Sequence, residues 1–419
     1  MRNEAAVKKI GNIFKVKESV TENKDTAERI GILFLYMSIV LEIVIVIIDK
    51  SNYTNPIEGQ LFRITFLLAS VKVLLTKYTK KEWIALIVFG ILGLVSYKVT
   101  GRNEILRIVV FIAACKNMDV KRILKLVFYA TLSGCLLLVF LSVSGIYGRL
   151  ALEADFGRGY VQTRYCLGIG HPNALHCMFL MLMALGLYLY NDRMKWYYYI
   201  ILFSLNYGLF ILTDSNTGVL MGVCTIAGAF VIRYLKGIRK QMWIYGAGIA
   251  VFLFCVIFSV LVADSRVTKP ANYWFENRWV AEAESHLNGR IIDLYYGSVN
   301  QEGTTATWSL FSRPENDYYF DMGFVRLFYW YGMIPAIVYV VLHVLLILRF
   351  YKRRDGMGLV MVSVFAVYTV VEAHLVSVYI GRNYILFLMG MYMSEMLYLG
   401  SVKEAYLWNA GKLLGRKYS

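Results

Sequence analysis

The longest polar stretch of the chain, residues 264–321, carries cations and aromatic residues at spacings that suit a phosphorylated sugar. Arg278, His286 and Arg290 lie in a part of it that is predicted to form one or two amphipathic helices along a membrane surface. Guanidinium groups bind phosphate oxygens through paired hydrogen bonds, and the neighbouring tryptophans and tyrosines can stack on sugar rings. An interfacial helix with an aromatic belt explains the same residues without a ligand, and the two interpretations are compatible.

Carboxylates collect at the end of this stretch, directly before the next apolar run. The polar residues there are Glu315, Asn316, Asp317 and Asp321. A carboxylate among aromatic side chains can have a raised pKa and act as a general base, and Glu315 is the first candidate for that role. Asn316 and Asp317 are candidate substrate ligands. A run of helix-capping residues is an equally good explanation of this composition.

A second polar cluster, RYCLGIGHPNALH, covers residues 164–176. Pro172 suits the first turn of a helix, so the residues before it are expected at a helix N-terminus. Such an end presents free N–H groups and a positive potential to phosphate, and Arg164 can add bidentate contacts. Arg164 and Asn173 are therefore candidate ligands, and His171 is the alternative base. A capped turn with an arginine that reaches the lipid headgroups is the structural explanation.

Three ionisable residues lie inside or at the edge of apolar runs near these clusters. Arg326 adjoins the long polar stretch, and Glu372 and His374 lie near the end of a later apolar run. Ionisable groups at membrane depth are costly and usually mark a functional path. Arg326 is therefore a further candidate ligand, with headgroup contact as the alternative, and Glu372 and His374 could support the site from beneath.

The composition is that of an integral membrane protein. Of the 419 residues, 58% are hydrophobic and 17% are charged, against roughly 45–50% and about 25% in soluble domains. The net charge of +16 resides in short loops, where it sets orientation, so nucleic acid is not an expected partner. Six scattered cysteines show neither disulfide nor zinc spacing, and P-loop and dinucleotide motifs are missing. No cofactor or metal is expected.

The hydropathy pattern predicts an all-α protein of about twelve transmembrane helices. The expected positions are about 30–48, 60–76, 82–98, 103–116, 122–147, 172–190, 196–213, 216–234, 242–263, 322–348, 357–378 and 382–400. Lysine and arginine concentrate in alternate loops, which places both termini in the cytoplasm.

The predicted organisation has five parts, and the two polar clusters share its extracytoplasmic face. The five parts are a basic cytoplasmic tail (1–29), transmembrane helices one to nine (30–263), a large extracytoplasmic loop (264–321), helices ten to twelve (322–400) and a cytoplasmic tail (401–419).

Four short motifs, in this order and topology, resemble those of the Wzy-type polysaccharide polymerases in the O-antigen ligase and polymerase superfamily. The family's R-x6-HPN pattern appears as Arg164 with His171-Pro172-Asn173, and its L-x-G-R element as Leu287-Asn288-Gly289-Arg290. Ser215-Asn216-Thr217-Gly218 is similar to S-R-T-G, with asparagine replacing arginine. The last element is Glu315-Asn316-Asp317-Tyr318, followed by Gly323. Ligases carry histidine at the position of Glu315, which favours the polymerase branch.

The resemblance implies a GT-C-like fold and a glycosyltransferase of the bacterial cytoplasmic membrane. Its substrates would be an undecaprenyl-diphosphate-linked glycan donor and a lipid-linked repeat unit as acceptor, and a flippase and a chain-length regulator would be its protein partners. Glu315, or alternatively His171, would deprotonate the acceptor hydroxyl, which attacks the anomeric carbon with inversion. The departing diphosphate would be stabilised by arginines, without a metal. These are Arg164, Arg290 and Arg278.

Two rival functions stay open on the sequence alone. A ligase of the same superfamily would transfer the glycan to another acceptor, and the residue at position 315 argues against it. A flippase or secondary transporter of lipid-linked sugars would place its charged residues near mid-bilayer, around broken helices. Here the charged residues gather toward the outer surface, which favours the polymerase.

Overall fold

The structure is a computed structural model that is almost entirely helical. It describes the backbone of residues 2–156, 159–265, 267–269, 274–275, 277–296 and 303–397, and the side chains from residue 26 onward except those of 267–269, 274 and 296. The predicted tail 401–419 lies outside these residues. Eight of the described helices are long and apolar enough to cross a membrane, which agrees with the predicted class of all-α membrane protein.

Most of the helices form one bundle, and short elements occupy the two polar clusters. The eight long helices are α1 (Arg2–Lys50), α3 (Lys80–Thr100), α5 (Val120–Val143), α6 (Pro172–Tyr190), α7 (Trp196–Thr213), α8 (Asn216–Tyr234), α9 (Met242–Ala263) and α13 (Met333–Arg353). The shorter bundle helices are α2 (Glu58–Leu74), α4 (Glu104–Ala114), α12 (Gly323–Tyr331), α14 (Gly356–Val371) and α15 (Tyr384–Leu397). The hairpin β1 (Ala151–Asp155) with β2 (Val161–Tyr165) leads into the cluster 164–176. The large loop contains the hairpin β3 (Val267–Lys269) with β4 (Trp274–Phe275) and the helices α10 (Arg278–Leu287) and α11 (Arg290–Tyr296).

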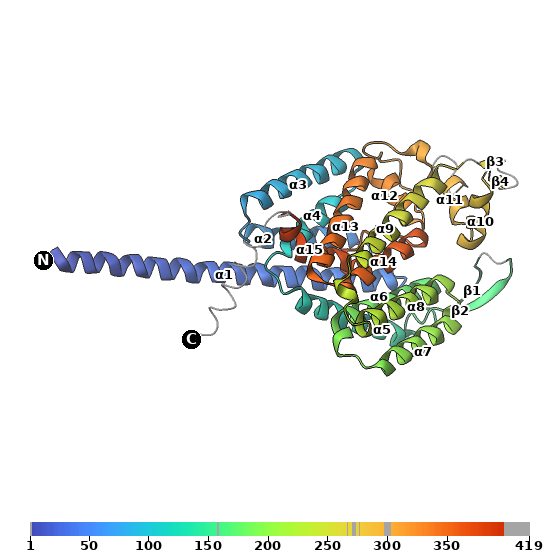
Figure 1. Ribbon diagram of the computed structural model, residues 1–419, viewed down its shortest axis with the longest axis horizontal. Helices are drawn as coiled ribbons and strands as arrows, with labels where there is room; N and C mark the ends of the chain where they lie inside the picture. The colour runs from blue at the N-terminus through green and yellow to red at the C-terminus, as the bar shows by residue number, and fades with distance from the viewer. Residues whose placement is uncertain are drawn as a thin grey trace.

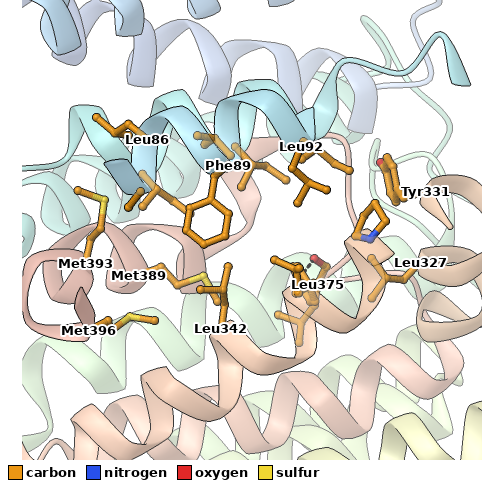
Figure 2. A pocket seen from close by; sticks show the side chains of 18 of the residues that line it. Leu86, Phe89, Leu92, Leu327, Tyr331, Leu342, Leu375, Met389, Met393 and Met396 are labelled. Atoms are coloured by element: carbon orange, nitrogen blue, oxygen red, sulfur yellow. Dashed lines mark hydrogen bonds between the residues drawn. The ribbon is translucent and has the colours of Figure 1, made fainter. Parts of the chain in front are cut away.

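Every predicted apolar segment overlaps at least one of these helices, so the approximate helix positions are confirmed. The figure of about twelve crossings stays a prediction, because α2, α4, α14 and α15 are shorter than a membrane-spanning helix. The predicted tail 1–29 continues directly into the membrane helix, since α1 is one helix from Arg2. Figure 1 shows α10, α11 and both hairpins at one end of the bundle, and α1 extending beyond the bundle at the other end.

The tenth predicted segment is two helices, α12 and α13, that meet at Gly332. This glycine has a φ of 92°, and a Cβ there would lie 2.6 Å from Phe311 Cα, so only glycine fits. The break leaves N–H groups of α13 without helical partners. They donate instead to the end of the large loop, from Met333 to the Ser309 carbonyl (2.9 Å) and from Ile334 to the Leu310 carbonyl (3.0 Å). The loop is thereby fixed to the bundle.

The eleventh predicted segment is helical only in its first part, because α14 ends at Val371 rather than near residue 378. The chain then runs without regular structure to the short 3-10 turn Ile380–Arg382, and α15 begins at Tyr384. We call residues 372–383 the α14–α15 break. Most of its side chains are buried. Buried non-helical backbone requires polar partners from the protein itself, and those partners define the site described next.

Candidate functional site

Arg290 joins the large loop to the α14–α15 break. Its guanidinium donates to the Val371 carbonyl (2.7 Å) and to Glu372 Oε1 (3.2 Å), and its Nε lies 3.6 Å from Asp321 Oδ2. The Arg290 side chain is only 16% exposed, against 25% for Glu372 and 44% for Asp321. We call Arg290, Asp321 and Glu372 the Arg290 cluster. It places one cation between two carboxylates that solvent still reaches.

The sequence around Arg290 determines its position through the turn between α10 and α11. Asn288 and Gly289 both have positive φ, 55° and 88°, a conformation that favours asparagine and glycine. Glu284, on α10, accepts a hydrogen bond from the Ile291 N–H (2.8 Å), so it caps the first turn of α11. The L-N-G-R motif therefore has a structural reason: it makes the tight turn that directs Arg290 at the end of α14.

The environment of Glu372 brings its pKa to a value suited to proton transfer. The pKa of Glu372 is raised to about 7: burial raises it most and the negative charge of Asp321 also raises it, while the positive charges of Arg290 and Arg382 lower it. Burial also raises the pKa of Asp293, whose carboxylate accepts from the Tyr318 hydroxyl (3.2 Å). A carboxyl group with a pKa near neutrality is half ionised at physiological pH, which is the condition for general base catalysis.

Two more arginines hold the carbonyls of the α14–α15 break. Arg326 donates to the Val376 carbonyl (3.0 Å), and Arg107 donates to the Val378 carbonyl (3.2 Å). With the bond from Arg290 to Val371, three arginines from separate elements satisfy the backbone of this segment. Arg326 was predicted to bind substrate; it is 3% exposed and acts first as a support, although its Nε and one terminal nitrogen have no hydrogen-bond partner.

The cluster at residues 164–176 lies beside the Arg290 cluster. Asn288, in the turn before Arg290, donates to the Phe156 carbonyl (3.2 Å). The Phe156 ring in turn lies under the Arg164 guanidinium (4.2 Å) and against the His171 ring (5.7 Å). Phe156 thus connects Arg164 and His171 to the turn that precedes Arg290. That the two loops share the extracytoplasmic face stays a prediction.

Within that cluster the positive charge of Arg164 is compensated. Its guanidinium lies 3.1 Å from Asp214 Oδ2 and donates to Gln162 Oε1 (2.8 Å). Arg164 is almost fully buried, while the Asp214 side chain is 33% exposed, so water reaches the pair from the carboxylate side. A phosphate at this position would compete with Asp214, and contacts that Arg164 makes to a ligand would require this pair to rearrange or share the guanidinium.

His171 caps helix α6, as the HPN motif predicted. Its Nδ1 accepts a hydrogen bond from the Asn173 N–H (3.2 Å), and Pro172 is the first helical residue. Loss of surrounding water lowers the pKa of His171, Asp321 raises it and Arg164 lowers it. With Nδ1 accepting, the neutral ring carries its proton on Nε2, so His171 can donate a hydrogen bond to a substrate oxygen but is poorly placed to act as a base. The side chain of Asn173 is partly exposed beside it.

The SNTG motif has a packing role. A Cβ at Gly218 would lie 2.5 Å from the His176 ring, so glycine is required for α8 to approach α6. The buried His176 ring contacts Thr213 Oγ1 through Nδ1 (3.0 Å) and Asn206 Oδ1 through Nε2 (3.1 Å). This buried network joins α6, α7 and α8, and it fixes the turn between α7 and α8 that contains Asp214.

The acidic run 313–317 is placed differently from its sequence-based prediction. Glu315 and Asp317 are exposed, while Asn316 is buried and donates to Ser312 Oγ (3.1 Å) and the Tyr329 carbonyl (3.2 Å). Arg102 fixes the backbone of the run by donating to the Asn316 carbonyl (2.6 Å). Asn316 therefore has a structural role that explains its place in the motif, and Glu315 occupies the outer surface beside it.

Arg278 lies on the outer face of α10. Its side chain is 93% exposed and pairs with Glu282 one turn along the same helix (3.0 Å). This is an ordinary surface ion pair. Arg278 stays a predicted ligand that depends on movement of α10 or on a substrate that extends beyond the Arg290 cluster.

Sequence reasoning underestimated the α14–α15 break. Arg382 lies there, its Nε is buried without a hydrogen-bond partner, and its charge acts on Glu372 and on His374. A usable signal was present: Arg382 is the one arginine of the last predicted apolar segment and stands at its first residue. Among the residues that the structure describes, no group of histidine, cysteine and carboxylate side chains could hold a metal ion.

Comparison with known proteins adds no assignment. No protein family, curated protein or solved structure matches this chain.

Proposed function

We propose that this protein is a membrane glycosyltransferase that joins lipid-diphosphate-linked oligosaccharide repeat units into a polysaccharide on the extracytoplasmic face. The proposal combines the motif resemblance with one geometric observation. Arg290 lies in contact with Glu372, a carboxyl group whose pKa is about 7. In this pair of side chains, Arg290 can stabilise a leaving diphosphate and Glu372 can act as the base for an attacking hydroxyl.

In the proposed reaction Glu372 takes the proton from the acceptor hydroxyl, in place of Glu315. The hydroxyl oxygen attacks the anomeric carbon of the donor sugar, and the bond from that carbon to the diphosphate oxygen breaks. The negative charge that develops on the leaving diphosphate is stabilised by Arg290, with Arg382 behind it. His171 donates from Nε2 to an oxygen of the same group, and the N-terminus of α6 adds its positive potential.

The test is reconstitution of the purified protein in vesicles with a lipid-linked repeat unit and no nucleotide sugar. Polymerisation yields a ladder of longer lipid-linked glycans. We expect Arg290→Ala to abolish the ladder, and Arg278→Ala, the matched exposed arginine, to preserve it. No ladder from the wild type, with a folded protein, would contradict the enzyme assignment.

A transporter of lipid-linked sugars is the second candidate, and the α14–α15 break favours it. Broken helices lined by buried polar groups are typical of substrate sites in secondary transporters, and His374 is buried there with both ring nitrogens unpartnered. The same vesicles discriminate: movement of the lipid-linked sugar between leaflets without chain growth would support transport, and chain growth from substrate supplied only on the outer side would support the enzyme.

A further inference from the structure

A basic pocket lies at the end of the bundle opposite the Arg290 cluster. It has a volume of about 380 Å³ and is formed by the end of α8, the turn before α9 and the end of α13. Its charged side chains are Asp192, Arg233, Lys236, Arg239, Lys240 and Arg354. Five cations and one carboxylate therefore face a single concave surface. It is independent of the proposed glycosyl transfer.

The carboxylate is already occupied by one of the cations. Arg239 lies 2.6 Å from Asp192 Oδ1 and also donates to the Ile232 carbonyl (3.2 Å). The other four cations form no ion pair with a carboxylate among the described residues. Like charges held in one pocket repel each other, and an anionic ligand relieves that repulsion. The excess of cations is the first observation that points to an anion.

The position of the pocket along the membrane axis is the second observation. Helix α8 begins at Asn216, next to Asp214, the partner of Arg164, and its 19 residues end at Tyr234 beside the pocket. At 1.5 Å per residue the helix spans about 28 Å, close to the roughly 30 Å of a bilayer core. The pocket and the candidate site thus lie at opposite membrane surfaces.

The third observation is the apolar surface beside the pocket. Leu235, Met242 and Trp243 are 55%, 66% and 65% exposed next to its basic residues. Large apolar side chains exposed at the end of a membrane helix are positioned to contact lipid, and tryptophan is typical of the headgroup level. A ligand that joins an anionic group to acyl chains satisfies both surfaces, whereas free phosphate would satisfy only the basic one.

We propose that this basic pocket binds the phosphate headgroup of an anionic phospholipid from the leaflet opposite the candidate site. Arg233 and Arg354 can form paired hydrogen bonds to phosphate oxygens, and Lys236 and Lys240 add charge. Basic pockets between membrane helices commonly bind such headgroups. The lipid would hold together the ends of α8, α9 and α13, and so stabilise the helices that pack around α14.

Basic residues are common in cytoplasmic loops, so residues of this kind outside the pocket provide a matched control. Arg193 and Lys195 are exposed at the same end of the molecule but do not line the pocket. The double variants Arg233→Gln/Lys236→Gln and Arg193→Gln/Lys195→Gln each remove two positive charges from this surface. A general electrostatic attraction to the membrane would weaken equally in both, while a pocket-specific contact would weaken only in the first.

The experiment measures lipid-dependent thermal stabilisation of the full chain in a neutral detergent. The probes are phosphatidylglycerol, phosphatidylcholine and inorganic phosphate, and the melting temperature without added lipid serves as the check on folding. We expect phosphatidylglycerol alone to stabilise the wild type and the control variant. In the pocket variant its apparent affinity should fall roughly 10- to 30-fold, since each basic residue near a headgroup contributes about 1 kcal/mol.

Several results would overturn the proposal, and three of them come from comparing the two double variants and the three probes. They are equal loss in both double variants, equal stabilisation by phosphatidylcholine, and full stabilisation by inorganic phosphate, which would indicate a site for soluble anions. If the first pocket variant does not fold, Lys236→Gln/Lys240→Gln repeats the test with two exposed lysines. Retention of wild-type affinity in a folded pocket variant also contradicts the proposal.

Discussion

Two acidic regions, the run 313–317 and the Arg290 cluster, differ in how the protein holds their carboxylates. In the run 313–317, Glu315 and Asp317 are exposed, and Arg102 donates to the Asn316 carbonyl beside them. In the Arg290 cluster, Glu372 and Asp321 face the same arginine from two different segments of the chain. The first region is contiguous in sequence, and the second is assembled by the fold.

The difference teaches where proton-transfer chemistry can be tuned. Desolvation and nearby charges are the main physical means of shifting a pKa. Glu372 experiences burial, one like charge and two opposite charges at once, which is how its pKa reaches about 7. A motif match identifies residues at the surface of such a site, while the group best suited to act as the base comes from a segment that carries no motif.

The most direct test of this difference between the two regions is to remove one carboxylate from each. Glu372→Gln keeps the size and hydrogen bonding of the side chain but cannot accept a proton. We expect the rate of ladder synthesis to fall by about 10² to 10⁴, the usual contribution of a general base. Glu315→Gln should stay within about threefold of the wild type, because the exposed side chain lies outside the Arg290 cluster.

Both variants are compared at equal amounts of folded protein, measured by thermal unfolding of each purified chain. A collapse of activity in Glu315→Gln with full activity in Glu372→Gln would return the role of base to Glu315, as the sequence analysis predicted. Equal collapse in both would mean that residues 313–317 move onto the Arg290 cluster when substrate binds.

The second prediction uses the charges around Glu372 to move its pKa in opposite directions. Arg290 lowers that pKa and Asp321 raises it. Activity requires the deprotonated carboxylate, so it should rise with pH through a midpoint near 7 and level off at higher pH. Asp321→Asn should move this rise to lower pH, and Arg290→Gln should move it to higher pH. Arg290→Gln should also lower the plateau by about 10² to 10³ through loss of leaving-group stabilisation.

The measurement is the initial rate of chain growth between pH 5.5 and 9, with a fixed lipid composition. A purely structural role for these two residues would lower the plateau without moving the midpoint. Midpoints that move together, or that stay where they are in both variants, would exclude Glu372 as the titrating base.

Much of the fold was accessible from the sequence because membrane helices are determined locally. Long apolar runs form helices that satisfy their own backbone, so the predicted segment 242–263 coincides with α9. The break at Gly332 and the α14–α15 break could not be predicted from the sequence in the same way. Gly332 reads as a glycine in an apolar run, and its φ of 92° is required only because the backbone of Phe311 packs against it.

The position of Arg290 was predictable from the sequence, whereas those of Arg382 and Glu372 were less so. The turn residues Asn288 and Gly289 require positive φ, a local property that a short motif records, so Arg290 was found. Glu372 lies near the end of an apolar run, where a charged residue is expected simply because a membrane helix ends there. Its relation to Arg290 spans 82 positions of the chain and depends on α14 ending at Val371, which hydropathy did not show.

The smallest expected effect comes from Arg278, which shares its residue type and its helical environment with Arg290 but not its contacts. Arg278→Gln should leave the rate within about twofold of the wild type and change the free energy of unfolding by less than about 0.5 kcal/mol. The reason is that its side chain is 93% exposed and its one ion pair lies within α10. Urea unfolding and the ladder assay on the same preparation measure both quantities. A large loss of rate without loss of stability would mean that α10 brings Arg278 onto the diphosphate, and the site would then close around its substrate instead of receiving it preformed.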